Sequence, residues 1–277
     1  MTILADYHTH TIFSHGKDDV IDNAIFAKEK GLKAIGISDH GFNHPAFGLS
    51  VNKIAPLKER VVKAKSITGI DVLLGVESNI IGTDGTVDFN LKNYDDFDLF
   101  IAGVHKFVMY KFGSIFSLAL PNLFHTYFSK KHVSKSVVKN TTKAYINVIK
   151  NNPVDIISHV NFCCFSNALE VAKCASDYGT YIELNSKKSH LTNEEINDIL
   201  AKTSAKFIIN SDAHSKERVG DFSLALKIAD KLQIPIDRIA NADKLPDFRF
   251  KRFKSEAGRW ILAILLKMKF YQKILEK

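Results

Sequence analysis

Seven short apolar segments, each followed by a polar side chain able to bind a metal or a substrate, constrain the fold of this chain most strongly. Two of them, residues 97–104 and 154–158, are almost uninterrupted apolar runs that end at His105 and His159. Such runs are typical of parallel strands buried on both faces. The other predicted strands cover residues 3–8, 33–38, 71–76, 180–184 and 205–210.

Helical patterns separate these strands. A helix is predicted over residues 19–30 with Gly31 as its stop, and another over residues 51–68. Thr192 and Glu195 form a capping box at the start of a later helix. Alternating strands and helices in 277 residues predict an α/β protein with a closed or nearly closed, TIM-like (β/α)7 barrel.

The first strand ends in the sequence Asp6-Tyr7-His8-Thr9-His10, and His15 follows. Alternate side chains of a strand share a face, so His8 and His10 can point at one cation. Catalytic groups in such barrels lie at the carboxyl ends of the strands. Nine residues are therefore candidate metal ligands: His8, His10, His15, His40, Glu77, His105, His159, Asp212 and His214.

Each candidate also has a structural interpretation when it is taken alone. His105 or His159 alone would more often be a hydrogen-bonded core residue, and Asp212 can cap a helix. Asp39 can orient the imidazole of His40 or cap a turn, and both interpretations stay open. The repetition of such residues at successive strand ends favours a metal site.

Imidazole and carboxylate ligands without thiolates suit zinc, manganese or iron rather than a structural cysteine-rich site. A carboxylate such as Glu77 can bring two cations to within about 3.5–4 Å of each other. Water bound to such cations loses a proton near neutral pH, which gives a hydroxide nucleophile aligned against phosphorus. The ligand set predicts hydrolysis of a phosphate ester and leaves the kind of ester open.

The net charge of +8 lies mostly in residues 244–277, which carry ten basic and three acidic side chains. The nearly neutral remainder argues against a nucleic acid as the partner. Three cysteines, Cys163, Cys164 and Cys174, form no disulfide framework. The chain reaches His8 without room for a signal peptide, so we expect a cytoplasmic protein.

The motifs His8-x-His10, His15, Ser38-Asp39-His40, Glu77, His105, Ile157-Ser158-His159 and Ser211-Asp212-Ala213-His214 resemble those of the PHP (polymerase and histidinol phosphatase) superfamily. The similarity extends over about residues 1–245 and is closest to the YcdX-like phosphatase branch. It implies a distorted seven-stranded barrel with three divalent metals per chain, zinc first and manganese or iron as alternatives.

The resemblance also implies how the ligands are divided among the cations. One cation would be held by His8, His10, Glu77 and Asp212. Glu77 would bridge to a second, held also by His105 and His159, and the third would be held by His15, His40 and His214. We assign the catalytic roles to Glu77, Asp212 and His214.

Contacts to a substrate phosphate are expected from residues near the mouth of the barrel. Lys106 follows His105, Arg218 lies four residues after His214, and Lys187-Lys188 follow the strand that ends at Asn185. A solvated surface position is an equal alternative for each. The histidines His44, His125, His132 and His190 lack a strand-end context and are assigned to loops or the surface, with His44 a candidate substrate contact.

Two segments depart from a compact barrel, which we place in residues 1–245. Residues 106–135 form an apolar insertion at the active-site face, with three interpretations: a lid over an apolar substrate pocket, a membrane-touching loop, or ordinary core packed on the tail. Residues 246–277 are predicted to be a basic and apolar helical tail. It fits peripheral contact with the inner face of an anionic membrane, with docking on the insertion or dimerisation as alternatives.

The sequence thus predicts a metal-dependent phosphatase that acts on a small phosphorylated substrate. A phosphodiesterase or 3′-5′ exonuclease and a histidinol phosphatase are the enzymatic alternatives. A metal-containing regulatory or membrane-surface binding protein is the alternative outside the enzymes, and the intact ligand set argues against it. No pattern in the chain indicates an oligomeric state.

Overall fold

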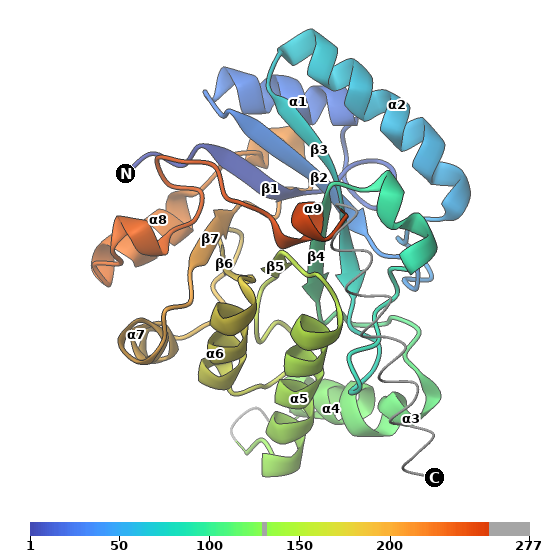
Figure 1. The fold of residues 1–277 in the computed structure, drawn as a ribbon. Coiled ribbons are helices and arrows are strands. Elements are labelled where there is room, and N and C mark those ends of the chain that lie inside the picture. Colours follow the sequence, from blue (N-terminus) through green and yellow to red (C-terminus); the bar gives the residue numbers. More distant parts are fainter. Residues whose placement is uncertain (129–131, 255–277) are drawn as a thin grey trace.

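The computed structural model describes residues 1–128 and 132–254, and within them seven parallel strands pair in sequence order (Figure 1). The His10 N–H donates to the Ala213 carbonyl at 2.8 Å, which joins the end of the first strand to the chain after the last. The predicted, nearly closed (β/α)7 barrel is therefore confirmed. The strands are β1 Ala5–Thr9, β2 Ala34–His40, β3 Asp71–Asn79, β4 Leu99–Gly103, β5 Ile156–Ile157, β6 Tyr181–Asn185 and β7 Phe207–Asn210.

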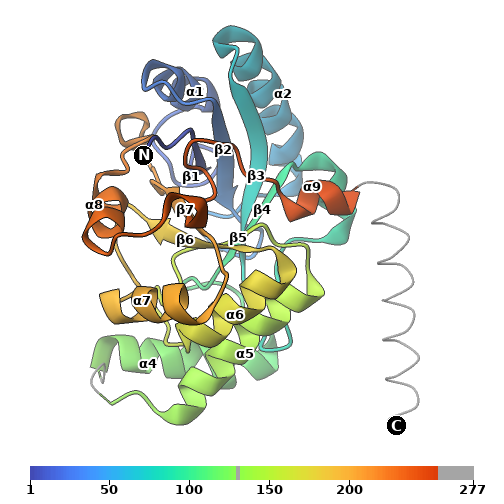
Figure 2. The same ribbon diagram turned by 60° about the vertical axis from the view of Figure 1, so that its left-hand side comes forward.

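Helices cover the outside of the barrel, with α1 and α2 on one side and α5, α6 and α7 on the opposite side (Figure 2). The first two helices match their predicted ranges to within one residue, and Gly69, with φ of 72°, ends α2 in a left-handed turn. The helices are α1 Val20–Glu29, α2 Val51–Thr68, α3 Phe112–Ser114, α4 Leu120–Phe128, α5 Lys135–Asn151, α6 Ala168–Tyr178, α7 Asn193–Lys202, α8 Ser223–Lys231 and α9 Arg249–Lys254. Short 3-10 helices cover Leu91–Asp96, Lys216–Arg218 and Ile236–Arg238.

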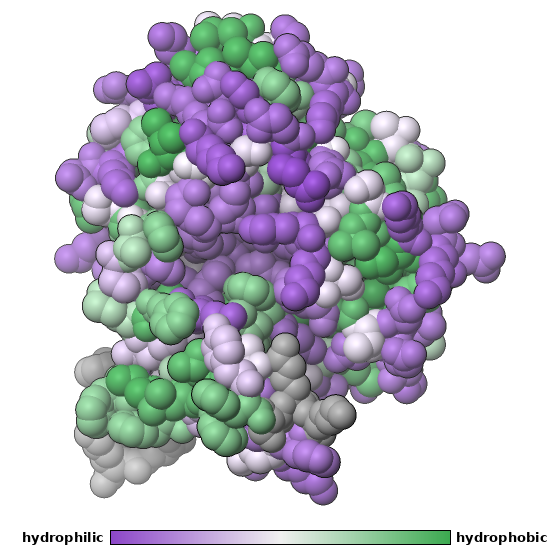
Figure 3. Space-filling model, turned by 180° about the vertical axis from the view of Figure 1, so that it is seen from behind, coloured by the Kyte–Doolittle hydropathy of each residue, from purple (hydrophilic) through white to green (hydrophobic). Residues whose placement is uncertain are grey.

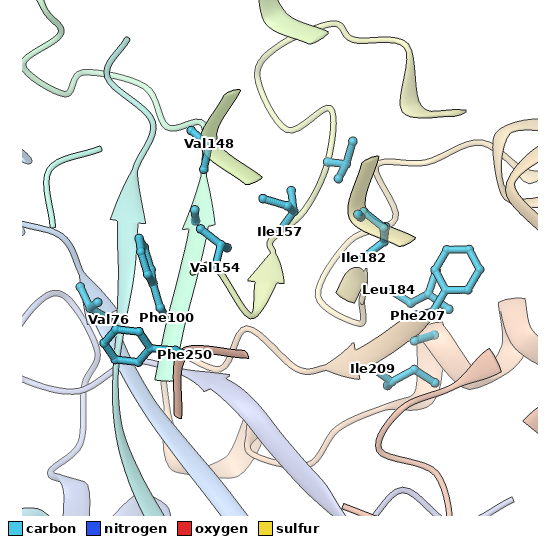
Figure 4. Close-up of a cluster of buried hydrophobic side chains, with 14 of the residues drawn as sticks. Val76, Phe100, Val148, Val154, Ile157, Ile182, Leu184, Phe207, Ile209 and Phe250 are labelled. Carbon is cyan, nitrogen blue, oxygen red and sulfur yellow. The ribbon is translucent and has the colours of Figure 1, made fainter. Parts of the chain in front are cut away.

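The larger apolar core lies between the strands and the surrounding helices (Figure 4). Phe250, in α9, is fully buried there, with its ring centroid 5.1 Å from that of Tyr94 and 5.8 Å from that of Phe100. The chain from 246 to 254, which the sequence assigns to the tail, therefore packs against the barrel. Residues 255–277, with most of the predicted tail helix, lie outside the described part of the chain.

A smaller apolar cluster fills the barrel interior near the beginnings of the strands. Every strand contributes to it, through Ala5, Tyr7, Ala34, Leu73, Leu99, Ile101, Ile156, Tyr181 and Ile208. Phe248 closes this end, with its ring edge-on to that of Tyr7 at 4.8 Å. A Cβ at Gly36 would lie 2.9 Å from the Leu99 side chain, so the glycine leaves room for this packing.

Further along β3, β6 and β7, the same inward positions carry polar side chains. Glu77 on β3, Glu183 on β6 and Asn210 on β7 continue the alternation of the apolar layer and are buried. The barrel interior therefore changes from apolar to polar toward the carboxyl ends of the strands.

A β-bulge in β1 turns His8, and His10 just after the strand, into this polar layer. Asp6 pairs with Ile35 and Thr9 with Ile37, so three steps along β1 face two steps along β2. Because the extra residue shifts the alternation, Tyr7 faces the apolar cluster while His8 and His10 both turn to the polar layer. The expectation that His8 and His10 share a face agrees with the structure, and the bulge turns that shared face inward.

The insertion forms a short helical arm outside the barrel. Helix α3 continues through the π-helical turn Ile115–Ala119 into α4, and Leu118 is its fully buried apolar anchor. The segment leaves several large apolar side chains exposed, among them Phe112 and Phe128, each 80% exposed. Among the described residues, we find no helix with the length and apolar character needed to cross a membrane.

Candidate metal centre

The carboxyl ends of the strands bring the predicted ligands to one place. His40 is the last residue of β2, and Glu77 lies within β3. His105 follows β4, His159 follows β5 and Asp212 follows β7. His15 reaches the same place from the turn after β1, where its ring stacks on that of His40 at 4.7 Å. In the described part of the chain, four groups of three have ligand atoms within 4.8 Å of one another: His8, Glu77 and His159; His8, His10 and Asp212; His10, His40 and His214; His40, Glu77 and His105.

Glu77 lies at the centre of this cluster and is fully buried. Its Oε1 is 2.7 Å from the Nε2 of His159 and 3.1 Å from the Nε2 of His105, while its Oε2 is 3.0 Å from the Nδ1 of His40. Burial alone would raise the pKa of Glu77, but the surrounding histidines hold it well below its usual value. Its two oxygens thus face different sets of imidazoles, as a bridging carboxylate requires.

Asp212 faces the histidines from the opposite side. Its Oδ1 is 3.5 Å from the Nε2 of His10 and 3.3 Å from the Nδ1 of His214. The residue has a φ of 51°, a left-handed conformation that is uncommon for aspartate, and His159 also has a positive φ. Such strain persists where the surrounding structure fixes it, as in binding sites.

The grouping of atoms in the structure differs from the division that the resemblance implies. His40 and His214 are grouped with His10, and His15 belongs to none of the four groups found among the described residues. The ring of His15 is nevertheless 4.2 Å from that of His214. The same nine residues are close together, and their division among cations stays a prediction.

The buried imidazoles leave ring nitrogens without hydrogen bonds. Among the described residues, unpaired buried atoms include Nε2 of His8, both ring nitrogens of His10 and His105, Nδ1 of His15, His40 and His159, and Oε2 of Glu77. Buried polar atoms are almost always paired in native proteins, so such a concentration requires a partner. The donor set therefore fits divalent cations, which use neutral imidazoles and carboxylates as ligands.

The outer imidazoles, those of His15 and His214, have lowered pKa values, which suits metal binding. Burial, together with the neighbouring His40 and His214, lowers the pKa of His15 to about 3. Burial likewise lowers the pKa of His214 to about 4, and the nearby Lys187 adds to the effect. Near neutral pH both rings are uncharged and keep a lone pair for a cation.

Glu183 supports the cluster from behind and was not identified from the sequence. Its Oε1 is 2.8 Å from the Nδ1 of His8, and its Oε2 accepts the His159 backbone N–H at 2.8 Å. Because an ionised carboxylate can only accept, His8 carries its proton on Nδ1 and presents Nε2 to Glu77 and Asp212. The signal that could have revealed it is a charged residue in the middle of a buried strand, Tyr181–Asn185.

The two interpretations of Asp39 are resolved by its contacts. Its carboxylate accepts hydrogen bonds from the backbone N–H of Thr11 at 2.8 Å, from the Thr11 hydroxyl at 2.6 Å and from the Ser14 hydroxyl. Asp39 therefore fixes the turn that carries His15, rather than orienting the imidazole of His40. Gly103 leaves room for the Ser158 side chain, because a Cβ at this position would lie 2.3 Å from the Ser158 hydroxyl oxygen.

A cavity of about 400 Å³ opens above the cluster, and Figure 3 shows it as a polar hollow. Of the predicted substrate contacts, Lys106 and His44 line it. Arg218 is not among its lining residues in the described chain, and its guanidinium pairs with Asp221 instead.

Further wall residues were not identified as cavity contacts from the sequence, among them Phe47, Phe162 and His190. His190 lies in a loop between β6 and α7, as expected, but its ring packs 5.1 Å from that of Phe162 in the cavity wall, a position that the sequence did not indicate. Lys187 and Lys188, the other predicted phosphate contacts, also line it, and the Nζ of Lys187 lies 3.4 Å from Oδ1 of Asp212.

Comparison with known proteins identifies the family. The sequence profile of the PHP domain matches residues 6–187. The chain belongs to the PHP domain family. A probable phosphatase from Caldanaerobacter subterraneus subsp. tengcongensis is 30% identical over 269 residues, with 93% of this chain and 95% of the relative covered. A probable phosphatase from Thermoanaerobacter sp. strain X514 is 32% identical over 252 residues, covering 88% and 92%.

A solved structure supports the fold of this PHP domain. The histidinol phosphate phosphatase from Lactococcus lactis, crystallised with zinc, L-histidinol and phosphate, superposes with a TM-score of 0.59. It is 16% identical, and the match covers 89% of this chain and 97% of that protein. The family match, the near-full-length relatives and the histidine-rich centre make the chain a phosphoric ester hydrolase.

Proposed function

We propose that this PHP domain protein hydrolyses phosphate monoesters at a centre of three divalent cations, with zinc the preferred metal. The observation that carries the proposal is the convergence of nine histidine and carboxylate side chains, six of which are imidazoles with buried ring nitrogens that lack hydrogen bonds. Zinc in the crystallised histidinol phosphate phosphatase supports the choice of metal. Relatives described as probable phosphatases support the class of reaction.

The residues available to hold the cations are the nine predicted ligands, with Glu77 as the bridging carboxylate. Divalent cations at such a site supply a water of lowered pKa and positive charge facing the phosphate oxygens. The remaining requirements fall on the protein: it must fix the ligands, keep the imidazoles neutral and bind the phosphate. The ligands are fixed by Glu183 and Asp39 through the hydrogen bonds described above. Ser158 also helps to fix them, because its hydroxyl donates a 2.9 Å hydrogen bond to Oε1 of Glu77.

Binding of the phosphate is assigned to two lysines on the cavity wall. Lys106 and Lys187 line the cavity, and the Nζ of Lys187 is 3.0 Å from the Nδ1 of His214. With Lys188, which also lines the cavity, they bring three ammonium groups to this site, and these attract the dianionic phosphate of a monoester more strongly than the singly charged phosphate of a diester. This charge balance favours a monoester over the nucleic acid diester, which was the principal enzymatic alternative.

The experiment compares p-nitrophenyl phosphate with bis-p-nitrophenyl phosphate, using enzyme reconstituted with zinc, manganese or iron and analysed for metal content. We expect two or three metal atoms per chain and a faster reaction with the monoester. Glu77→Gln should lower kcat/KM by at least about 100-fold, because even supporting residues of metal sites contribute 10–100-fold. Glu59→Gln, an exposed carboxylate on α2, is the matched control.

The outcomes separate the alternatives. Preference for the diester would favour the phosphodiesterase. A metal-free protein after reconstitution, or near-wild-type turnover by Glu77→Gln, would show that the reaction occurs elsewhere or does not involve these ligands.

A further inference from the structure

A second hollow lies beside the metal cavity, between the chain after β4 and the helical arm of the insertion. Its volume of about 410 Å³ is similar to that of the cavity above the ligand cluster, which we call the metal cavity. Both volumes lie within the range of roughly 300–1,000 Å³ that is typical of ligand pockets. We call it the apolar groove, because its walls include Val108, Met109, Ile115, Leu120 and Leu123.

Two polar side chains of the apolar groove, Tyr110 and Asn122, are engaged with the protein itself. The Tyr110 hydroxyl donates to the His105 carbonyl at 2.8 Å. The Asn122 amide donates to the Thr141 hydroxyl at 2.8 Å, and its oxygen accepts the Phe165 N–H at 3.0 Å. An occupant of the groove therefore meets apolar contacts rather than these hydrogen-bonding groups, and the groove suits a hydrocarbon chain.

The apolar groove adjoins the metal cavity. His105, Lys106 and Phe107 line both, so the two hollows share a wall. The Nζ of Lys106 donates to the Tyr127 hydroxyl of α4 at 3.0 Å and lies 4.8 Å from the centre of that ring. The arm thus holds an ammonium group at the junction, where the charged and apolar ends of one molecule would meet.

The rim of the groove is unusually apolar for exposed surface. Phe107, Met109 and Leu120 are 68%, 58% and 48% exposed, and Phe116 on the same arm is 65% exposed. Figure 3 shows apolar surface gathered next to the polar hollow. Contiguous exposed apolar surface of this kind marks a binding site more often than chance exposure does.

We propose that the substrate is a phosphate monoester carrying an apolar chain, with the phosphate in the metal cavity and the chain in the apolar groove. The placement of the phosphate rests on the proposed function. The placement of the apolar chain follows from the groove, and binding of the chain can be measured without turnover. A sugar phosphate or a nucleic acid end would leave the apolar groove empty.

The test measures binding of alkylphosphonates, which are not hydrolysed, to the full-length metal-loaded protein by calorimetry. Chains of two to ten carbons are used below their aggregation concentrations. Each buried methylene should tighten binding by up to about fourfold, so octylphosphonate should bind at least about tenfold more tightly than ethylphosphonate. A Kd independent of chain length would overturn the inference.

Matched variants locate the effect. Leu120→Asp places a charge in the groove, while Phe128→Asp places the same charge on the same helix at a side chain that is 80% exposed and does not line the groove. We expect Leu120→Asp to remove most of the chain-length gain and Phe128→Asp to retain it. Equal losses would indicate general repulsion of the anion and would contradict the assignment.

Failure of this inference differs from failure of the proposed function. Hydrolysis of p-nitrophenyl phosphate together with a flat chain-length profile would overturn only the apolar chain. A steep profile without hydrolysis of any phosphate monoester would retain the groove as a binding site and overturn the phosphatase.

Discussion

Replacing Glu183 by glutamine tests whether the buried carboxylate orients the candidate metal ligands. Four donors surround it: His8 Nδ1 and Asn210 Nδ2 lie 2.8 and 3.0 Å from Oε1, and His159 N and Asn185 Nδ2 lie 2.8 and 3.0 Å from Oε2. A glutamine offers one acceptor oxygen and one donor amide. In either orientation the amide therefore faces two donors, and two of the four hydrogen bonds are lost.

The magnitude follows from these contacts. A hydrogen bond to a charged group contributes about 1.5–3 kcal/mol, so losing two should lower the free energy of unfolding by about 3 kcal/mol or more. If the amide faces His8, the ring proton must move to Nε2, the atom that lies 3.2 Å from Oε1 of Glu77. That change removes a lone pair from the cluster, and metal affinity should fall by about 10–100-fold.

The assay is zinc competition with a chromophoric chelator, combined with kcat/KM for p-nitrophenyl phosphate and urea unfolding. Glu194→Gln, an exposed carboxylate on α7, controls for the loss of a negative charge. If Glu183→Gln kept metal affinity and kcat/KM within about twofold of the wild type, the assigned role of Glu183 would be refuted.

Two further predictions concern the barrel. Phe250→Ala should lower the free energy of unfolding, measured in urea, by about 3–5 kcal/mol because the ring is fully buried. Phe112→Ala removes a ring that is 80% exposed and should lower it far less. Equal urea midpoints for the two variants would contradict the packing of α9. Burial raises the pKa of Asp155 to about 7, although hydrogen bonds from the Phe250 and Phe100 N–H groups oppose this rise. The folded state therefore keeps the proton of Asp155 to a higher pH than the unfolded state does. Relative to Asp155→Asn, the wild type should lose roughly 2–3 kcal/mol of stability between pH 5 and 7. Parallel stability curves would rule out this titration.

The barrel could be predicted because its signals are local. Unalternating apolar runs such as 97–104 indicate strands buried on both faces, and Gly31 and Gly69 mark helix ends within the sequence itself. The insertion was recognised as a departure, and a lid over an apolar pocket was one of three interpretations, but the sequence specified neither the helices of the arm nor the position of the groove. A groove depends on which faces of the arm meet the chain after β4, and no local pattern specifies that contact.

Supporting residues were missed or left open for a related reason. Glu183 and His190 gain their significance from neighbours on other strands and loops, such as His8 and Phe162. Asp39 could be resolved because the turn at Thr11, distant in sequence, donates hydrogen bonds to its carboxylate. Arg218 looked well placed by its spacing from His214, yet its short helix directs it to Asp221 instead.

The sequence by itself determined the kind of chemistry, because histidines and carboxylates follow successive strands, and parallel strands must present their carboxyl ends at one edge. Tertiary structure decided the rest. The bulge in β1 turns His8 and His10 inward, Glu183 fixes the proton of His8, and the helical arm encloses an apolar groove beside the cluster. These features depend on distances between residues far apart in the chain, which only the closed barrel defines.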